Sequence, residues 1–306
     1  MKEKAYPTLA GILLGMLIIG TFVLADLDSK STNIAKATTS LASSSIDLPL
    51  NIQLGLDYKF NSQVDYQFSI LQDFANSKPG TYSIYIKDLK TGVEKTLNKD
   101  TNYYSASLYK VPVAIAVLRD VEANKISLEN ELTLTLFDKE SGSGSLQGYK
   151  TGSKLTVKQT LEKLLKESDN TAQNMLTRSI SMPVGNYFPY ASVTRFPNTL
   201  NITPSEMIEL LEKLATYSYL AAENSNLIIN MLSQTSFDDR INVGLGEDVT
   251  FSHKIGNWGN EGSWHDCGIV LNEKIVLVCV MSSGTTYEDF VEVSEETGKF
   301  IKAFML

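Results

Sequence analysis

The apolar positions near the start of the folded region alternate between helical and strand spacing. Residues 64–75 carry apolar and aromatic side chains at helical intervals, and the pattern stops before Gly80. Residues 82–86 alternate instead, and a polar turn separates them from a second short run at 93–97. Two such runs around a turn predict an antiparallel hairpin that follows a helix.

The middle of the chain is predicted to be helical. An apolar segment at 111–118 predicts a helix that ends near Asn124. Thr156 and Thr203 are each followed three residues later by Gln or Glu. This spacing is a capping box, in which the two side chains satisfy free backbone N–H groups at a helix start. Apolar stripes follow both threonines, so each is expected to open an amphipathic helix.

The C-terminal part returns to strands before a closing helix at 288–305. Two apolar runs, 267–271 and 275–281, are separated by three polar residues and predict a second hairpin. Strands at both ends around a helical middle predict an α+β fold. We expect an antiparallel sheet flanked by helices and a separate all-helical lobe.

One cysteine lies in each of these two runs. Whether Cys267 and Cys279 face one another depends on the turn, because a slip of one residue moves a side chain to the other face. They are either two buried small hydrophobes, the interpretation we favour, or a disulfide of an exported protein.

The N-terminal residues indicate export. Two lysines precede 17 uncharged, mostly apolar residues at 9–25. Residues 1–25 are therefore expected to be a signal peptide or an N-terminal membrane anchor. Residues 26–57 are rich in Ser and Thr and lack aromatic residues. Such a segment buries too little apolar surface to order itself, so we predict a disordered tether and a folded domain at 58–306.

Composition excludes some classes of function. The net charge is -8 with a pI near 5.0. An acidic chain without a Lys/Arg cluster is not expected to bind nucleic acid, which requires neutralisation of phosphates. The chain has two histidines and two cysteines without metal-ligand spacing. No metal and no cofactor are therefore expected.

The candidate chemistry begins at Ser107 and Lys110, which adjoin the apolar segment at 111–118. Residues three apart on a helix share a face, so the hydroxyl and the amine can touch. A serine needs a base within about 2.6 to 3.2 Å to act as a nucleophile. Lysine is such a base only when its pKa is lowered. Taken alone, however, a Ser-x-x-Lys sequence occurs often by chance.

Two further motifs follow in order, Ser168-Asp169-Asn170 and Lys254-Ile255-Gly256. The set resembles that of class A β-lactamases and penicillin-binding proteins, in which Thr or Ser stands in place of Ile255. The resemblance covers about residues 58–306 and includes the Gly- and Ser-rich stretch at 142–147 and the strand at 265–270. It implies a DD-peptidase/β-lactamase-like fold and an exported serine hydrolase.

The resemblance also implies a role for each matching residue. Ser107 would be the nucleophile, Lys110 its base or proton relay, and Ser168 the proton shuttle to the leaving nitrogen. Asn170, Ile255 and Gly256 would contact the substrate. Lys254 would lower the pKa of Lys110 and attract an anionic substrate, and the N–H groups of Ser107 and Asn257 would form the oxyanion hole. Asp169 is expected to be structural.

Two departures from the family pattern concern deacylation and substrate binding. The family carries a Glu-x-x-Leu-Asn segment whose glutamate positions the hydrolytic water, but residues 177–202 contain no Asp or Glu. The next carboxylate, Glu206, belongs to the Thr203 capping box. Ile255 lacks the hydroxyl that helps to hold a substrate carboxylate, a loss for which Asn257 or Ser252 could compensate.

Three functions fit these residues. The first is a monomeric, extracytoplasmic serine hydrolase that is acylated by β-lactams at Ser107 and releases them slowly. The second is a D-Ala-D-Ala carboxypeptidase that acts on peptidoglycan stem peptides. The third is a non-catalytic cell-wall-binding or sensor domain. The five polar residues Ser107, Lys110, Ser168, Asn170 and Lys254 favour the first two.

Overall fold

The computed structural model describes residues 50–188 and 200–306, with side chains from residue 61 onward. The expected signal or anchor at 1–25 lies outside the described residues. Helix α2 runs from Leu50 to Ser77, so residues 50–57 are helical where the sequence predicted a disordered tether. Once a helix is nucleated by its packed part, further turns add at little cost. Within the described part of the chain, no helix is both long and apolar enough to span a membrane.

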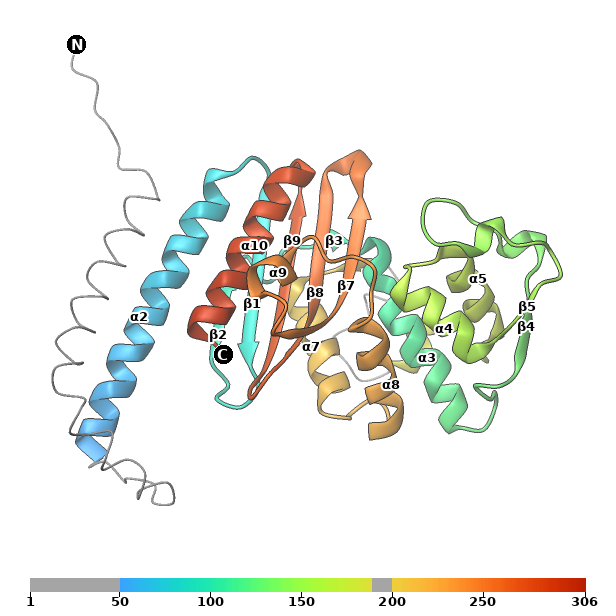
Figure 1. Cartoon of the computed structure of the whole chain (residues 1–306), viewed down its shortest axis with the longest axis horizontal. Coiled ribbons are helices and arrows are strands. Elements are labelled where there is room, and N and C mark those ends of the chain that lie inside the picture. The colour runs from blue at the N-terminus through green and yellow to red at the C-terminus, as the bar shows by residue number, and fades with distance from the viewer. Residues whose placement is uncertain (1–49, 189–199) are drawn as a thin grey trace, which may run out of the picture. The chain divides into compact units, whose positions relative to one another are not determined.

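A five-stranded antiparallel sheet forms the centre of the unit Phe60–Leu306 (Figure 1). Its order is β2-β1-β9-β8-β7, so both predicted hairpins are present and strands from the two ends of the unit lie side by side. Strand β7 lies at an edge. The strands are β1 (Thr81–Asp88), β2 (Glu94–Leu97), β7 (Thr250–Trp258), β8 (Ser263–Leu271) and β9 (Ile275–Ser283).

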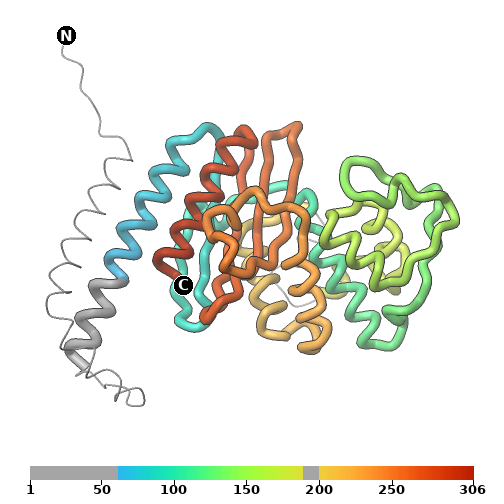
Figure 2. The backbone as a smooth tube through the Cα atoms, viewed as in Figure 1, coloured from blue at the N-terminus to red at the C-terminus, as the bar shows by residue number. Residues whose placement is uncertain are grey.

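The two faces of the sheet are buried by different helices. On one face, Tyr82, Ile84 and Ile86 pack with Phe68 of α2 and with Phe290 of α10 (Tyr287–Phe304). In Figure 2, α10 crosses this face of the sheet. The alternating side chains of the opposite face pack with the helical lobe. The period of two along β1 thus divides one strand between two cores.

The helical lobe surrounds α3 (Lys110–Glu122), whose residues from Val111 to Leu118 are all buried. A helix that is apolar on all sides is stable only when neighbours enclose it. The capping boxes at Thr156 and Thr203 are both present. The α+β prediction, with its flanked sheet and helical lobe, is therefore confirmed. The remaining helices are α4 (Val157–Lys166), α5 (Asn170–Ser179), α7 (Pro204–Ala215), α8 (Ala222–Leu232) and α9 (Ile241–Leu245).

Short strands and 3-10 turns lie in the connections between the larger elements. Strand β3 (Tyr103–Tyr104) pairs with β6 (Asn201–Ile202), and β4 (Glu131–Thr133) pairs with β5 (Lys154–Thr156). Single 3-10 turns complete the connections. They are η2 (Ala106–Tyr109), η3 (Leu136–Asp138), η4 (Leu146–Gly148), η5 (Val184–Tyr187) and η7 (Gly259–Glu261).

The two cysteines are directly opposite one another on β8 and β9 and form a disulfide. The interpretation that we favoured, two buried hydrophobes, is wrong in this structure. The register between Leu271 and Ile275 sets the pairing, and residues in register on adjacent strands point to the same face.

Candidate active site

Ser107 lies in η2, between the short strand β3 and helix α3. Its neighbour Ala106 has φ 45°, in the left-handed region that non-glycine residues rarely adopt. The first residue of α3 is Lys110, and its Nζ is hydrogen-bonded to Ser107 Oγ at 2.8 Å. The predicted contact between hydroxyl and amine is therefore present in the structure.

The amine of Lys110 also contacts the turn between α4 and α5. Its Nζ donates to Asn170 Oδ1 at 2.7 Å and to Ser168 Oγ at 3.3 Å. Ser168 has φ 54°, which turns the backbone sharply before α5 begins at Asn170. Two residues of the turn therefore face the same amine.

Asp169 points away from that amine. Its carboxylate accepts from the N–H of Ala172 at the start of α5 and from the N–H of Leu146, each at 2.8 Å. It is the N-cap of α5 and is fully buried, as expected for a structural residue. Gly144 packs on it with φ 89°, and a Cβ at that position would lie 2.1 Å from Asp169 Oδ2. The Gly- and Ser-rich stretch at 142–147 therefore packs closely against the turn between α4 and α5.

Lys254 on β7 completes the cluster. Its side chain is buried, and its Nζ donates to Ser168 Oγ at 2.9 Å. Ser168 therefore lies between two lysine amines, one of which touches Ser107. The structure brings together the five polar residues that the three motifs supplied. We call Ser107, Lys110, Ser168, Asn170 and Lys254 the catalytic cluster.

Burial lowers the pKa of both lysines. Removal from water lowers the pKa of Lys110 to about 8, although the Asp169 and Glu140 carboxylates act in the opposite direction. The pKa of Lys254 is well below its ordinary value, first through burial and then through the charges of Lys110 and Arg240. The expectation that Lys254 lowers the pKa of Lys110 therefore needs correction, because burial lowers the Lys110 pKa and it is the Lys110 charge that lowers the pKa of Lys254.

The three residues after Lys254 continue the edge strand β7. Ile255 is 3% exposed, and Gly256 lies where an added Cβ would be 3.0 Å from the Ser105 carbonyl. Asn257 is exposed, and its side-chain oxygen accepts from Arg240. Ser252 is fully buried and cannot reach a substrate, so it does not replace the hydroxyl that Ile255 lacks.

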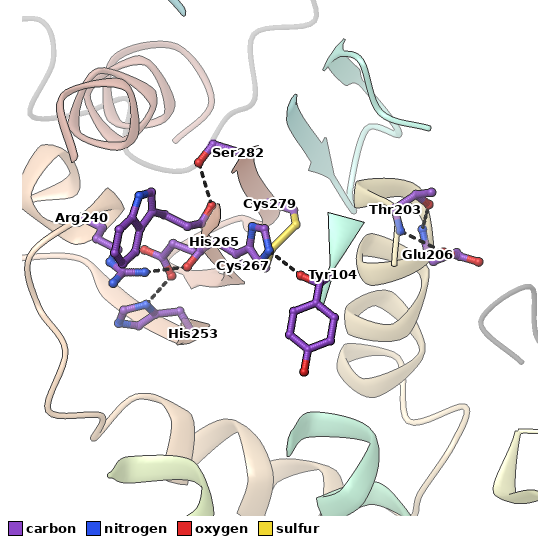
Figure 3. Close-up of a disulfide and its surroundings, with 11 residues drawn as sticks. Tyr104, Thr203, Glu206, Arg240, His253, His265, Cys267, Cys279 and Ser282 are labelled. Carbon is purple, nitrogen blue, oxygen red and sulfur yellow. Dashed lines mark hydrogen bonds and ion pairs between the residues drawn. A yellow bond between two sulfur atoms is a disulfide. The ribbon is translucent and has the colours of Figure 1, made fainter. Parts of the chain in front are cut away.

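Arg240 is a residue of this region that the sequence analysis missed. Its guanidinium is 1% exposed, and it donates from Nη1 to the His265 carbonyl at 2.7 Å (Figure 3). Its Nη2 donates to Asn257 Oδ1 at 2.8 Å. Its charge also lowers the pKa of Lys254. The sequence signal was weak, because Arg240 follows two aspartates in a loop and carries no local motif.

Residues 200–201 lie beside the short segment that leads to Ser107. Ser105 N–H donates to the Leu200 carbonyl at 2.8 Å, and Asn201 pairs with Tyr104. Leu200-Asn201 matches the end of the family's Glu-x-x-Leu-Asn segment, which assigns Pro197 to the position of the glutamate. Residues 189–199 themselves lie outside the described residues.

Glu206 does not replace this carboxylate. Its Oε2 accepts from the Thr203 N–H at 2.9 Å, as the capping box requires (Figure 3). Among the described residues there is also no group of three or more His, Cys, Asp or Glu side chains that could hold a metal ion.

The fold and this cluster fit a serine hydrolase of the β-lactamase type, with Ser107 between an antiparallel sheet and a helical lobe. The β-lactamase enzyme family matches residues 68–303, and the chain belongs to this family. A β-lactamase of Streptomyces albus G is 25% identical in an alignment of 218 positions, with coverage of 61% of this chain and 66% of that protein. β-Lactamase VEB-1 of Pseudomonas aeruginosa is 23% identical in an alignment of 271 positions, with coverage of 78% of this chain and 86% of the relative.

Solved structures show the same fold. The protein PBP-A superimposes with a TM-score of 0.70 at 19% identity, over 78% of this chain and 95% of that one. A β-lactamase from Sphaerobacter thermophilus gives a TM-score of 0.70 at 22% identity, over 80% and 97% of the two chains. The predicted family and its fold are therefore confirmed.

Proposed function

We propose that this chain is an exported serine hydrolase that forms an acyl-enzyme on Ser107 with β-lactams and hydrolyses it slowly. The observation that carries the proposal is the 2.8 Å contact between Ser107 Oγ and Lys110 Nζ, in a site that lowers the pKa of the amine to about 8. A neutral amine at this distance can accept the hydroxyl proton.

In the proposed acylation, Lys110 takes the proton of Ser107 as Oγ attacks the carbonyl carbon of the lactam. The carbon–nitrogen bond of the ring then breaks, and the nitrogen receives a proton through Ser168. That hydroxyl contacts both Lys110 Nζ and Lys254 Nζ, so it can donate one proton and receive another. The backbone N–H groups of Ser107 and Asn257 are assigned to the developing oxyanion.

The cations of the site favour a substrate with a carboxylate. Lys254 and Arg240 are both buried close to the cluster, and an anion relieves their mutual repulsion. Ile255 removes one hydrogen bond that a Thr would give to that carboxylate. Such a bond to a charged group contributes about 1.5 to 3 kcal/mol. Binding is therefore weakened, and Arg240 supplies part of the lost attraction.

Slow release follows from the missing base. Residues 177–202 contain no carboxylate, and the carboxylate of Glu206 caps α7. Without a general base to activate water, the ester on Ser107 persists. The same absence favours a second candidate, a peptidase that cleaves peptidoglycan stem peptides. Such a peptidase is not expected to carry the loop glutamate that β-lactamases use to activate water.

Export is proposed from two separate features. Residues 1–25 have the charge and apolar pattern of a signal peptide or membrane anchor. The Cys267–Cys279 disulfide is typical of an oxidising compartment. The third candidate, a non-catalytic domain, does not require five polar side chains to be joined in one hydrogen-bonded cluster, and we set it aside.

Intact-mass spectrometry after exposure to benzylpenicillin tests the proposal. We expect the mass of one penicillin to be added to the wild-type chain within minutes and to remain for minutes after the excess is removed. Ser107→Ala should gain no mass, and Ser145→Ala is the control for a serine outside the cluster. Equal labelling of wild type and Ser107→Ala would refute acylation at Ser107. Immediate return to the free mass would refute slow release.

A further inference from the structure

His265 extends from β8 toward the segment that carries Ser107. Its ring is fully buried and its Nε2 is 2.8 Å from the carbonyl oxygen of Tyr104, three residues before Ser107 (Figure 3). A carbonyl only accepts, so Nε2 carries the hydrogen. Burial lowers the pKa of His265 to about 4, which keeps the ring neutral at neutral pH. This contact joins the main sheet to the strand that leads to the nucleophile.

The same residue is also joined to the end of β7. Its backbone pairs with Gly256, and its carbonyl accepts from Arg240, whose other Nη donates to Asn257. A Cβ added at Gly256 would lie 2.9 Å from His265 Cδ2 and 3.0 Å from the Ser105 carbonyl. The imidazole, the glycine and the Ser105 backbone are therefore closely packed.

The nucleophile turn needs such support. Ala106 holds a left-handed backbone, which costs about 1 to 3 kcal/mol and persists only when its surroundings enforce it. The backbone hydrogen bonds that leave this segment, from Ser105 to Leu200 and from β3 to β6, lead to the loop before α7, and its contact with Gly256 of β7 is packing alone. Neither set of hydrogen bonds fixes the distance from Ser107 to β7. The His265–Tyr104 hydrogen bond links that segment directly to the strand next to β7.

We propose that His265 is a positioning residue that sets the spacing between the backbone N–H groups of Ser107 and Asn257. These are the two donors assigned to the oxyanion, so the inference rests on the proposed function for its catalytic consequence. Its structural content, a mechanical link from β8 to both donors, is independent of any substrate. The two parts can therefore be tested separately.

Amide NMR of the free protein tests the link without catalysis. His265→Gln places an N–H donor within reach of the Tyr104 carbonyl, whereas the side chain of His265→Asn is too short and that of His265→Leu has no donor. We expect the amide resonances of Ser107 and Asn257 to shift in the Asn and Leu variants and to remain near wild type in the Gln variant.

Ser282→Ala is the matched control, because it removes a side-chain hydrogen bond to the neighbouring Trp264 carbonyl at 3.1 Å. It should leave both amide resonances unchanged. If His265→Leu does not fold, the Gln and Asn pair carries the test. Unchanged amides in His265→Asn, or equal shifts in the Gln and Asn variants, would overturn the inference.

Acylation kinetics test the consequence. With a chromogenic cephalosporin, the acylation rate constant should fall about 10- to 100-fold in the Asn and Leu variants, since a misplacement of about 1 Å costs that order of rate. Apparent substrate affinity should change little, and His265→Gln should recover most of the rate. A loss confined to the fraction of active molecules would indicate a folding role and would overturn the inference. Absence of acylation in the wild type would refute the proposed function, while the amide result would still decide the link.

Discussion

The catalytic cluster and the neighbouring segment 177–206 differ in how their polar groups are used. In the cluster, Lys110 contacts Ser107, Ser168 and Asn170, so three hydrogen bonds converge on one amine. In the segment, the carboxylate of Glu206 is engaged by the helix that it caps. The cluster thus contains the groups assigned to the proposed acylation, whereas residues 177–202 contain no carboxylate for the proposed deacylation.

The difference separates two half-reactions that share one nucleophile. Formation of an acyl-enzyme needs a base at Ser107, and Lys110 lies at the required distance. Its hydrolysis needs a base that activates water, but residues 177–202 contain no Asp or Glu, and the Glu206 carboxylate caps α7. Each of the four changes below alters one side of this comparison.

Loss of the Lys110 amine should have the largest effect. Lys110→Met removes the proposed general base while it keeps an unbranched buried side chain, and acylation should slow by about 10²- to 10⁴-fold. Stopped-flow kinetics with a chromogenic cephalosporin measure this rate. Lys163→Met, which removes a lysine from an ion pair on α4, should acylate at the wild-type rate. Rapid acylation of Lys110→Met would assign the base elsewhere.

A carboxylate introduced into the segment should restore the second half-reaction. Pro197→Glu gives residues 197–201 the sequence Glu-x-x-Leu-Asn, which ends at Leu200-Asn201. The lifetime of the penicillin adduct should fall about 10- to 100-fold, which is below the full range for a native general base because the site is not optimised for it. Time-resolved intact mass measures the lifetime. Asn198→Glu, shifted by one residue, is the control, and equal acceleration in both would show that position is irrelevant.

The pH dependence of acylation should follow the lowered pKa of Lys110. With a pKa of about 8, the neutral amine is about one-tenth of the total at pH 7 and about nine-tenths at pH 9. The base is the deprotonated form, so acylation should become faster as pH rises, by about tenfold over this interval. The second-order acylation constant from pH 6 to pH 10 measures it. A profile that is flat or that falls would contradict Lys110 as the base.

The smallest effect is expected at Ile255. A Thr at this position adds a hydroxyl next to Lys254, so substrates with a carboxylate should acylate the chain about 3- to 10-fold faster. The methyl ester of the same substrate should show no gain. Ile255→Val, which has the shape of Thr without the hydroxyl, is the matched control. If Thr and Val behave alike, the side chain does not face the substrate.

Features with short sequence separation were predictable. The capping boxes, the hairpins and the Ser107–Lys110 contact depend on spacings of two to four residues, which backbone geometry fixes. The Ser168 and Lys254 contacts were predictable because the motifs resemble those of a family. No local pattern could have shown that Ser168 Oγ lies 3.3 Å from Lys110 Nζ and 2.9 Å from Lys254 Nζ.

Features that depend on distant contacts were not predictable in this way. Arg240 and His265 reach the site from a loop and from β8, and nothing near either residue in the sequence marks a role. The pairing of the cysteines required the register of β8 and β9. The cause of the lowered Lys110 pKa required the burial that only the folded lobe supplies.

The left-handed backbone at Ser168 lets three consecutive residues point in different directions. The turn directs the Ser168 and Asn170 side chains toward the lysines, while Asp169 anchors the next helix from the other side. Glycine is the residue that adopts this backbone without strain. A Ser168→Gly replacement would therefore delete the hydroxyl and relieve the turn, and it would distinguish proton transfer from support of the fold more cleanly than an alanine.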